Sequence, residues 1–418
     1  MPRRDPLHVW LHGTRVAELT SNRPGEVACR YTEEALALWD LNIPLLSCSL
    51  PLSRRQHRSG GTYFRGLLPE GAARASLASW AGVATFDTFG MLARFGRDVA
   101  GAAVIAAGES APRAGSAELY DEAGLSAEVD AIEDHPLAVH DDSELSLAGL
   151  QNKLLLVATP QGWARPVAGY PSTHILKVED RRFPGLVTLE AAVLRLAAAV
   201  GLTTVRATVA SFAGVDCLIV SRFDRAAAES AAPADDRHPQ PLTRVHQEDV
   251  CQALGRNADA ASGKGKYEAA GGPSFVEVAA LLDRFAADPT RELERLLAVA
   301  TFTVATGNAD AHGKNLSLLH PLPGVVELAP LYDTIPTALF PMLRTDAAMT
   351  VNGRTRLAGV TGSDLVAEAR RWRLDESAAA AVVEMTLDAL ATAADNDDVA
   401  CPPGLARFVQ TRCASLRP

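Results

Sequence analysis

Residues 306–315 gather acidic, amide and basic side chains of the kinds that phosphoryl transfer uses. Asp310 and Asn315 stand in the pattern D-x-x-x-x-N, and another acidic residue, Asp333, follows further along the chain. Phosphoryl transfer needs one carboxylate to accept the proton of the attacking hydroxyl, and hard oxygen ligands that hold Mg²⁺ against the nucleotide phosphates. From the six-residue pattern alone, a polar loop that only caps a helix and satisfies backbone groups is the better interpretation. The following hairpin and Asp333 make the two interpretations about equal.

The segments on either side of this loop predict how its residues are positioned. Residues 296–306 are apolar and uncharged, which suits a buried helix, and Gly307 is a plausible terminator just past its end. Residues 316–319 and 325–328 are predicted strands joined by a Pro/Gly-rich turn. The hairpin reverses the direction of the chain, so Asp333 is expected close to the loop. Protein kinases use the same order, with a second metal-binding aspartate beyond a short hairpin.

Length, charge and cysteine spacing limit the class of protein. The 418 residues suffice for two or three domains, and the net charge of −10 argues against unaided binding to nucleic acid. The first residues lack the apolar core of a signal peptide, and no uncharged run approaches the ~20 residues of a membrane span. Six scattered cysteines without a C-x-x-C pair indicate reduced core residues. We therefore expect a cytoplasmic protein that has no membrane contact.

The first part of the chain predicts a small α+β unit over residues 5–108. Residues 7–11 and 15–19 resemble strands joined at His12-Gly13, and a helical pattern extends from residue 63 to residue 107. The Gly/Ser/Ala/Pro-rich residues 108–116 are a predicted linker. The acidic residues 121–144 are typical of a solvated surface.

Two segments of the next region are candidates for contacts with phosphate. Residues 143–153 combine small residues with a following β-run and could lie over phosphates, although an ordinary hairpin is the better interpretation from sequence alone. Lys177 lies on a predicted strand, residues 174–178, and a buried lysine needs a counter-anion. A nucleotide phosphate would serve, with Glu190 on the following helix as an orienting partner. A lysine that reaches solvent from an edge strand is an equal alternative.

The remaining elements follow the order of a two-lobed kinase. Residues 189–200 predict a helix, and residues 205–212 and 215–220 an antiparallel pair. Residues 221–225 would then connect the two lobes. Their backbone groups would bind adenine, and Asp224 could reach the ribose. A surface charge cluster is the simpler interpretation of the same residues. Residues 226–241 are a predicted mobile loop, and residues 262–273 a flexible one. Helices are expected at 247–254, 275–285, 290–306, 363–372 and 376–394.

Several short motifs, in the same order, resemble those of the HipA family of serine/threonine kinases, the toxins of bacterial toxin–antitoxin pairs. The similarity runs from about residue 7 to beyond residue 340. The motifs that carry it lie at 15–19, 49–52, 66–69, 96–102, 146–153, 174–177, 222–225, 247–249, 266–268, 271–273, 306–315 and 332–333.

The resemblance implies a fold and a set of site residues. The fold would be α+β, a two-lobed protein-kinase-like fold with a small N-terminal α/β domain and a mainly helical C-terminal lobe. Its domains would be 5–108 (HipA-type N-terminal subdomain), 117–225 (β-rich nucleotide-binding lobe) and 242–418 (helical catalytic lobe). Asp310 would be the base, with His312 and Lys314 in the catalytic loop, and Asn315 and Asp333 would bind Mg²⁺. ATP would contact Ala148, Gly149, Gln151, Lys153, Lys177, Ser221, Arg222, Phe223 and Asp224, and Ser146 would be the autophosphorylation site.

The resemblance also implies partners. Family members transfer the ATP γ-phosphate to a protein, an aminoacyl-tRNA synthetase in the best-known cases, and so arrest growth. A small helix-turn-helix antitoxin, HipB-like, restrains them and supplies most contacts to DNA, which agrees with the acidic composition of this chain. Two alternatives stay open: a small-molecule kinase of the aminoglycoside-phosphotransferase type, and a catalytically idle scaffold for a DNA-binding antitoxin.

Overall fold

The computed structural model describes residues 4–23, 25–58, 60–113, 115–132, 153–227 and 242–417. The chain forms two compact units, each assembled from three stretches of sequence. Unit 1 comprises Met1–Val178, Ala210–Glu248 and His320–Gly324, and unit 2 comprises Glu179–Val209, Asp249–Leu319 and Val325–Pro418. The domain boundaries predicted from sequence stay predictions.

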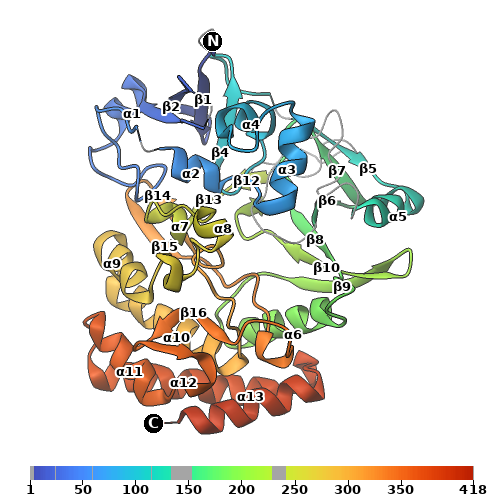
Figure 1. Cartoon of the computed structure of the whole chain (residues 1–418), viewed down its shortest axis with the longest axis vertical. Helices are drawn as coiled ribbons and strands as arrows, with labels where there is room; N and C mark the ends of the chain where they lie inside the picture. Colours follow the sequence, from blue (N-terminus) through green and yellow to red (C-terminus); the bar gives the residue numbers. More distant parts are fainter. Residues whose placement is uncertain are drawn as a thin grey trace. The chain divides into compact units, whose positions relative to one another are not determined.

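The first sheet of unit 1 is built around the predicted hairpin (Figure 1). Strands β1 (Leu7–Leu11) and β2 (Thr14–Thr20) pair in antiparallel fashion across His12 and Gly13, whose φ angles of 50° and 84° suit a tight two-residue turn. With β3 (Ala28–Tyr31) and β4 (Ala103–Ala107) they form a sheet of order β3-β2-β1-β4.

Helices α1 (Glu33–Leu38), α2 (Gly61–Gly66), α3 (Gly71–Trp80) and α4 (Thr88–Phe95) accompany this sheet. The predicted helical pattern up to residue 107 is wrong at its end, since Ala103–Ala107 is strand β4. Its alanines favour a helix locally, but pairing with β1, from Leu7 opposite Ala107 to Leu11 opposite Ala103, decides the conformation.

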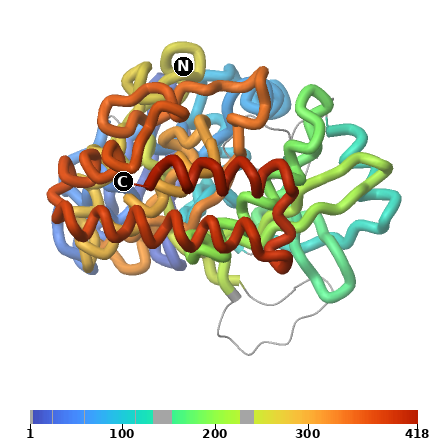
Figure 2. The backbone as a smooth tube through the Cα atoms, turned by 90° about the horizontal axis from the view of Figure 1, so that it is seen from below, coloured from blue at the N-terminus to red at the C-terminus, as the bar shows by residue number. Residues whose placement is uncertain are grey.

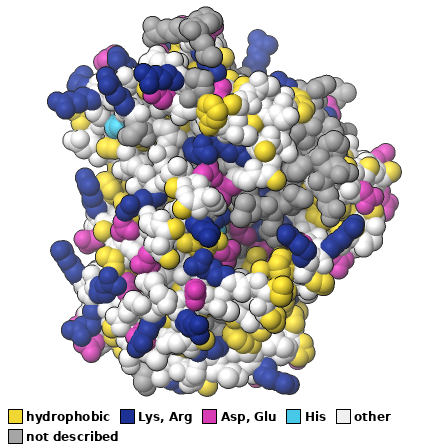
Figure 3. Space-filling model, in the orientation of Figure 1, with side chains coloured by type: hydrophobic (Ala, Val, Ile, Leu, Met, Phe, Trp, Pro, Cys, Tyr) yellow, Lys and Arg dark blue, Asp and Glu magenta, His cyan; other side chains and the backbone are white. Residues whose placement is uncertain are grey.

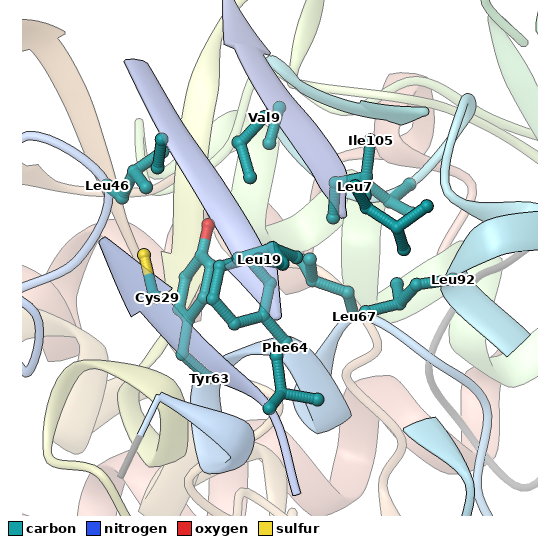
Figure 4. Packing of buried hydrophobic residues seen from close by; sticks show 14 of the residues in the cluster. Leu7, Val9, Leu19, Cys29, Leu46, Tyr63, Phe64, Leu67, Leu92 and Ile105 are labelled. Atoms are coloured by element: carbon teal, nitrogen blue, oxygen red, sulfur yellow. The ribbon is translucent and has the colours of Figure 1, made fainter. Parts of the chain in front are cut away.

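The core of this first sheet is aliphatic and aromatic. Figure 4 shows side chains from the strands and from the neighbouring helices converging on one another. Leu7, Val9 and Leu19 come from the strands, and Phe64 and Leu67 from the region of α2; all are at most 2% exposed. Burial of each such side chain contributes about 1.5–3 kcal/mol, so this subdomain has a core of its own.

The second sheet has the order β5-β7-β6-β8-β10-β9. Its strands are β5 (Ser116–Leu119), β6 (Lys153–Thr159), β7 (Gly162–Val167), β8 (His174–Val178), β9 (Ala207–Phe212) and β10 (Val215–Ser221). One face packs on helix α5 (Glu122–Ala131), where Leu154 and Leu176 join Leu125 and Val129 in a buried cluster. Strands β11 (Arg225–Ala227) and β12 (Leu242–Arg244) pair separately, so the first two residues of the predicted 226–241 loop are in a strand, and the others lie outside the described residues.

Unit 2 is mainly helical. Its helices are α6 (Leu186–Ala199), α7 (Val250–Ala253), α8 (Ala260–Gly263), α9 (Phe275–Phe285), α10 (Pro289–Thr306), α11 (Gly362–Arg371), α12 (Glu376–Ala394) and α13 (Pro403–Leu416). The predicted hairpin is β14 (Ser317–Leu322) and β15 (Val325–Leu328), and β16 (Asp346–Val351) pairs with β17 (Arg354–Arg356).

One predicted helix of this region is partly wrong. Residues 247–249 belong to strand β13 (His246–Asp249), and the helix starts only at Val250. A capping box explains the starting point: the Asp249 side chain accepts from the backbone N–H of Gln252, whose side chain accepts from the Asp249 N–H.

Helix α12 lies at the centre of the helical layer. It packs against α6, α10, α11 and α13, and Figure 2 shows α12 and α13, in red, side by side. Among the described residues, α12 is the one helix long and apolar enough to cross a membrane by length and composition. It is 44% buried in this structure, and its buried face packs on those helices, which accounts for the apolar residues on that face.

Candidate active site

The loop that carries Asp310 starts from a rigid helix end. Helix α10 is buried along its last two turns, and Gly307 caps it with a left-handed φ of 72°. A side chain at this position would also collide, because a Cβ atom would lie 2.8 Å from both Ala338 and Phe408. Only glycine meets both demands, so the point at which the loop leaves the helix is fixed, as the sequence predicts.

The backbone of Asp310 is held by three hydrogen bonds. Its N–H donates to Asn308 Oδ1 at 3.0 Å, and its carbonyl accepts from Asn315 Nδ2 at 3.1 Å and from the His312 N–H at 2.8 Å. Its side chain accepts a hydrogen bond from the Tyr267 hydroxyl at Oδ1, 2.7 Å away. Burial raises the pKa of the Asp310 carboxyl, and the Tyr267 hydrogen bond opposes that rise. A carboxylate of raised pKa accepts a proton more readily.

Asn315 and Asp333 converge on Asp310, as predicted. Besides its bond to Asp310, Asn315 Nδ2 lies 3.5 Å from the carbonyl oxygen of Asp333, and the Asp333 carboxylate is close enough to raise the pKa of Asp310. Asp333 has a φ of 50°, a strained conformation for aspartate. A pocket is lined by Asn308, Asn315, Asp333 and Thr334, among others.

The donor set suits a hard cation. Since the amide nitrogen of Asn315 donates to two carbonyls, its Oδ1 is left for another ligand. An amide oxygen and a carboxylate oxygen are the ligands that Mg²⁺ prefers. These residues therefore fit a magnesium ion.

Lys314 connects the loop to the start of helix α7 through an ion pair. Its Nζ lies 2.8 Å from Asp249 Oδ2, with both side chains buried, and its carbonyl accepts from the Tyr332 hydroxyl at 2.7 Å. A buried ion pair of this kind is costly to break on one side. In this structure Lys314 therefore stabilises the loop, and its catalytic role stays a prediction.

His312 is 5% exposed and stands edge-on to the Tyr267 ring, with 5.2 Å between ring centroids. Burial lowers the pKa of His312 to about 3, so the imidazole is neutral at pH 7. Its catalytic role is likewise still a prediction.

Tyr267 is the residue of this loop region that sequence reasoning missed as part of the site. It belongs to residues 262–273, for which we expected flexibility. The structure differs: the Gly313 N–H donates to the Lys266 carbonyl, and the Gly272 N–H to the Tyr267 carbonyl. The only signal in the sequence was the motif of residues 266–268, which contributed to the family resemblance.

In unit 1, Lys153 and Lys177 face one another. They are opposite residues in the antiparallel register of β6 and β8, and they are 7% and 5% exposed. Strand β8 lies between β6 and β10, so the edge-strand interpretation of Lys177 is wrong. Two like charges directly opposite one another are unfavourable in isolation. Both lysines also interact with other groups of the chain, and phosphate binding by the pair stays a prediction.

Arg222 and Asp224 are buried in a charged network of unit 1. Arg222 Nε and Nη2 donate to Asp224 Oδ1 and Oδ2 at 2.9 and 2.8 Å, and the Gly101 N–H donates to Asp224 Oδ2 at 2.7 Å. The interpretation of these residues as a surface charge cluster is wrong, because they are 6% and 2% exposed. Ribose binding by Asp224 stays a prediction, although its carboxylate is already engaged.

The other predicted ATP contacts are divided between described and undescribed residues. Ser221 ends strand β10 opposite His174 in the register, and Phe223 follows Arg222 in the turn after the strand. Ser146, Ala148, Gly149 and Gln151 lie outside the described residues. Asp310, His312, Lys314, Asn315 and Asp333 thus come together in unit 2, and Lys153 and Lys177 in unit 1.

Comparison with known proteins identifies similar sequences over most of the chain. A family model described as the HipA N-terminal domain matches residues 7–106, and one described as the HipA-like C-terminal domain matches residues 145–394. The protein Y4mE of Sinorhizobium fredii, which its name proposes to be a kinase, is 40% identical over 364 residues, 84% of this chain and 82% of that protein. The serine/threonine-protein kinase toxin HipA of Shewanella oneidensis is 28% identical over 359 residues, 83% of this chain and 78% of that toxin.

The fold is similar to that of a solved complex. The structure of Shewanella oneidensis HipA with HipB and operator DNA contains a chain that matches at a TM-score of 0.79 and 25% identity, covering 98% of this chain and 96% of that one. This similarity confirms the expected α+β, kinase-like fold, with an N-terminal sheet domain and a helical C-terminal region.

Proposed function

Since the chain belongs to the HipA family of toxin kinases, we propose that it transfers the γ-phosphate of ATP to serine or threonine of a protein and acts as the toxin of a toxin–antitoxin pair. The observation that carries this proposal is the convergence of Asp310, Asn315 and Asp333 around one loop. A base and two oxygen ligands for magnesium are the parts that phosphoryl transfer takes from a protein.

Each residue has a defined role in the proposal. Asp310 accepts the proton of the acceptor hydroxyl, and Asn315 and Asp333 hold Mg²⁺ through oxygen atoms. Lys153 and Lys177 bind phosphate oxygens through their ammonium groups. Bound Mg²⁺ and ATP supply the phosphoryl group and neutralise the charge that develops on it.

The same proposal extends to regulation and partners. Phosphorylation of Ser146 would add negative charge to a phosphate-binding loop, repel ATP and switch the kinase off. A small helix-turn-helix antitoxin would restrain the kinase and contact the operator DNA. The net charge of −10 supports this division. Figure 3 shows both basic and acidic side chains on one face of the molecule. The protein substrate is a cytosolic protein, for which an aminoacyl-tRNA synthetase is the first candidate to test.

The first prediction concerns transfer itself. The purified chain, incubated with γ-labelled ATP, Mg²⁺ and a bacterial lysate, should label a lysate protein. It should also gain one phosphate on Ser146, seen by intact mass and peptide mapping. Asp310→Ala should abolish both, because no other carboxylate replaces the base, while its circular dichroism spectrum should remain that of the wild type.

The alternatives predict different results. Label found only on small molecules would identify a small-molecule kinase and reject a protein substrate. Growth arrest that persists in cells producing Asp310→Ala would identify an idle scaffold. Wild-type protein that transfers no label to any acceptor would overturn the proposal.

A further inference from the structure

The Tyr267 hydroxyl donates a hydrogen bond to the side chain of Asp310, with 2.7 Å between Tyr267 Oη and Asp310 Oδ1. Among the described residues, no group donates to the second oxygen, Oδ2. A carboxylate held at one oxygen loses rotational freedom and presents the other in a fixed direction. Tyr267 therefore determines which oxygen of the base is available.

The ring of Tyr267 is held on several sides. The guanidinium carbon of Arg344 lies 4.4 Å from the ring centroid, and the Lys266 Nζ lies 6.0 Å from it. The His312 ring meets it edge-on at 83°. A cation over a phenol ring is attracted to it and also strengthens the hydroxyl as a donor. Arg344 is itself fixed, because its Nε donates to the Asp346 carbonyl at 2.7 Å.

The turn that carries Tyr267 is built into the surrounding structure. The Lys266 carbonyl accepts from the Gly313 N–H at 3.1 Å, and the Tyr267 carbonyl accepts from the Gly272 N–H at 2.9 Å. The next side chain, Glu268, accepts from both the N–H and the hydroxyl of Thr350. The phenol position is thus determined by packing and hydrogen bonds on both sides of the residue.

We propose that Tyr267 is a positioning residue of the phosphoryl-transfer reaction, which orients Asp310 through Oδ1 so that Oδ2 faces the acceptor hydroxyl, with Arg344 holding the phenol ring. This inference depends on the proposed function, since it assigns a partner to the same base. Tyr267 neither donates nor receives the phosphoryl group. Proton transfer takes place between the acceptor hydroxyl and Asp310 Oδ2, and the Tyr267 proton stays on Tyr267.

The test compares initial rates of label transfer from γ-labelled MgATP into lysate protein for the full chain and its variants. Tyr267→Phe removes one hydroxyl and keeps the ring, so kcat should fall by about 10- to 100-fold, as expected when a hydrogen bond to a charged group is lost. The KM for ATP should stay within about twofold. Arg344→Met should lower kcat by about two- to fivefold, and Arg344→Lys, which retains a cation, should restore most of it.

Tyr120→Phe is the matched control, because Tyr120 lies in unit 1 beside the cluster of Leu125 and Val129 and has no part in the site. It should transfer label at the wild-type rate. If Tyr267→Phe melts at a lower temperature than wild type, the two proteins are compared at a temperature at which circular dichroism shows both to be fully folded.

The outcomes separate the inference from the function on which it depends. If Asp310→Ala is inactive but Tyr267→Phe keeps the wild-type kcat, the inference is overturned and the function stands. A rise in the KM for ATP at unchanged kcat would assign Tyr267 to nucleotide binding and also overturn it, as would phosphate found on Tyr267 itself. If Asp310→Ala transfers label at the wild-type rate, the proposed function fails, whatever Tyr267→Phe does.

Discussion

Among single residues, His246 has a buried ring whose protonation state follows from its two hydrogen bonds. Its Nε2 donates to the Leu46 carbonyl at 2.9 Å, and its Nδ1 accepts from the Ala102 N–H at 3.4 Å, so the imidazole is neutral. Burial first, and then the neighbouring His320, lower the pKa of His246 to about 3. An unfolded chain would protonate this histidine near pH 6.5.

We therefore predict that acid destabilises the fold well above the range of the carboxylates. Between pH 6.5 and pH 3, the unfolded chain binds a proton at His246 that the folded chain does not, so stability falls as the pH falls. The loss should be about 2 kcal/mol at pH 5 for such a histidine. Urea unfolding of wild type and His246→Gln at pH 7 and pH 5 measures it, and the variant should lose less between the two pH values. Equal losses in both proteins would contradict the assignment.

The sequence predicted some site residues and not others for a physical reason. The D-x-x-x-x-N spacing and the following hairpin were sufficient to bring Asp310, Asn315 and Asp333 together, because loop and hairpin are local structures. Tyr267 could not be identified in this way, since its contact with Asp310 spans a long separation in sequence. The buried state of Asp224 was also missed. Its counter-charges, Arg222 and Arg225, are its near neighbours in sequence, but the Gly101 N–H that also binds its carboxylate comes from a distant segment.

At the scale of elements, the loop of residues 306–315 and the Lys266–Gly272 turn meet at a position without a side chain. A Cβ atom on Gly313 would lie 2.5 Å from Pro273 Cγ and 2.9 Å from Cys251 Sγ. No real Cβ comes so close, so a side chain here would separate the turn from the loop. The glycine thus maintains the packing that carries Tyr267.

We predict that Gly313→Ala lowers phosphoryl transfer by at least tenfold and destabilises the protein by about 1–3 kcal/mol. The alanine would displace Pro273 and, with it, the turn that orients the base. Label transfer and thermal melting measure the two effects. Gly404→Ala in helix α13 is the matched control, since nothing lies within 4 Å of its Cβ; it should be neutral or slightly stabilising. Full activity in Gly313→Ala would show that the loop accommodates the methyl group.

Elements with strong local signals were predicted well. Helices α9 and α12 have the predicted bounds, and α10 differs by one residue at its start, because capping residues and apolar periodicity mark their ends. Strands β4 and β13 were predicted as helix. Their residues have no strong β signal of their own, and they become strands through pairing with segments far away in the sequence.

At the scale of the whole molecule, a buried ionic network joins the first subdomain of unit 1 to the second sheet of the same unit. Asp98 Oδ1 accepts from Arg225 and Arg244, each at 2.9 Å, and Asp98 Oδ2 accepts from the Ser172 N–H. Arg222 links Asp224 to the Val99 carbonyl. Ion pairs lower the pKa of both aspartates despite their burial, so both are charged.

We predict that Asp224→Asn destabilises unit 1 by about 3–5 kcal/mol, because it leaves buried guanidinium groups without their counter-charge. The midpoint of urea unfolding measures the loss. Glu118→Gln, which breaks the more exposed Arg165–Glu118 pair in the same unit, should cost less than about 1 kcal/mol. Similar costs for the two changes would show that the network adds nothing beyond an ordinary surface pair.

The two units also have a consequence for biosynthesis. Neither is continuous in the sequence: unit 1 includes His320–Gly324, and unit 2 combines Glu179–Val209 with segments after residue 248. Domains generally fold in order as they leave the ribosome, but here the early half cannot finish alone. A nascent polypeptide that has not yet reached residue 320 therefore lacks part of both units, and under the proposed function it could not yet transfer phosphate.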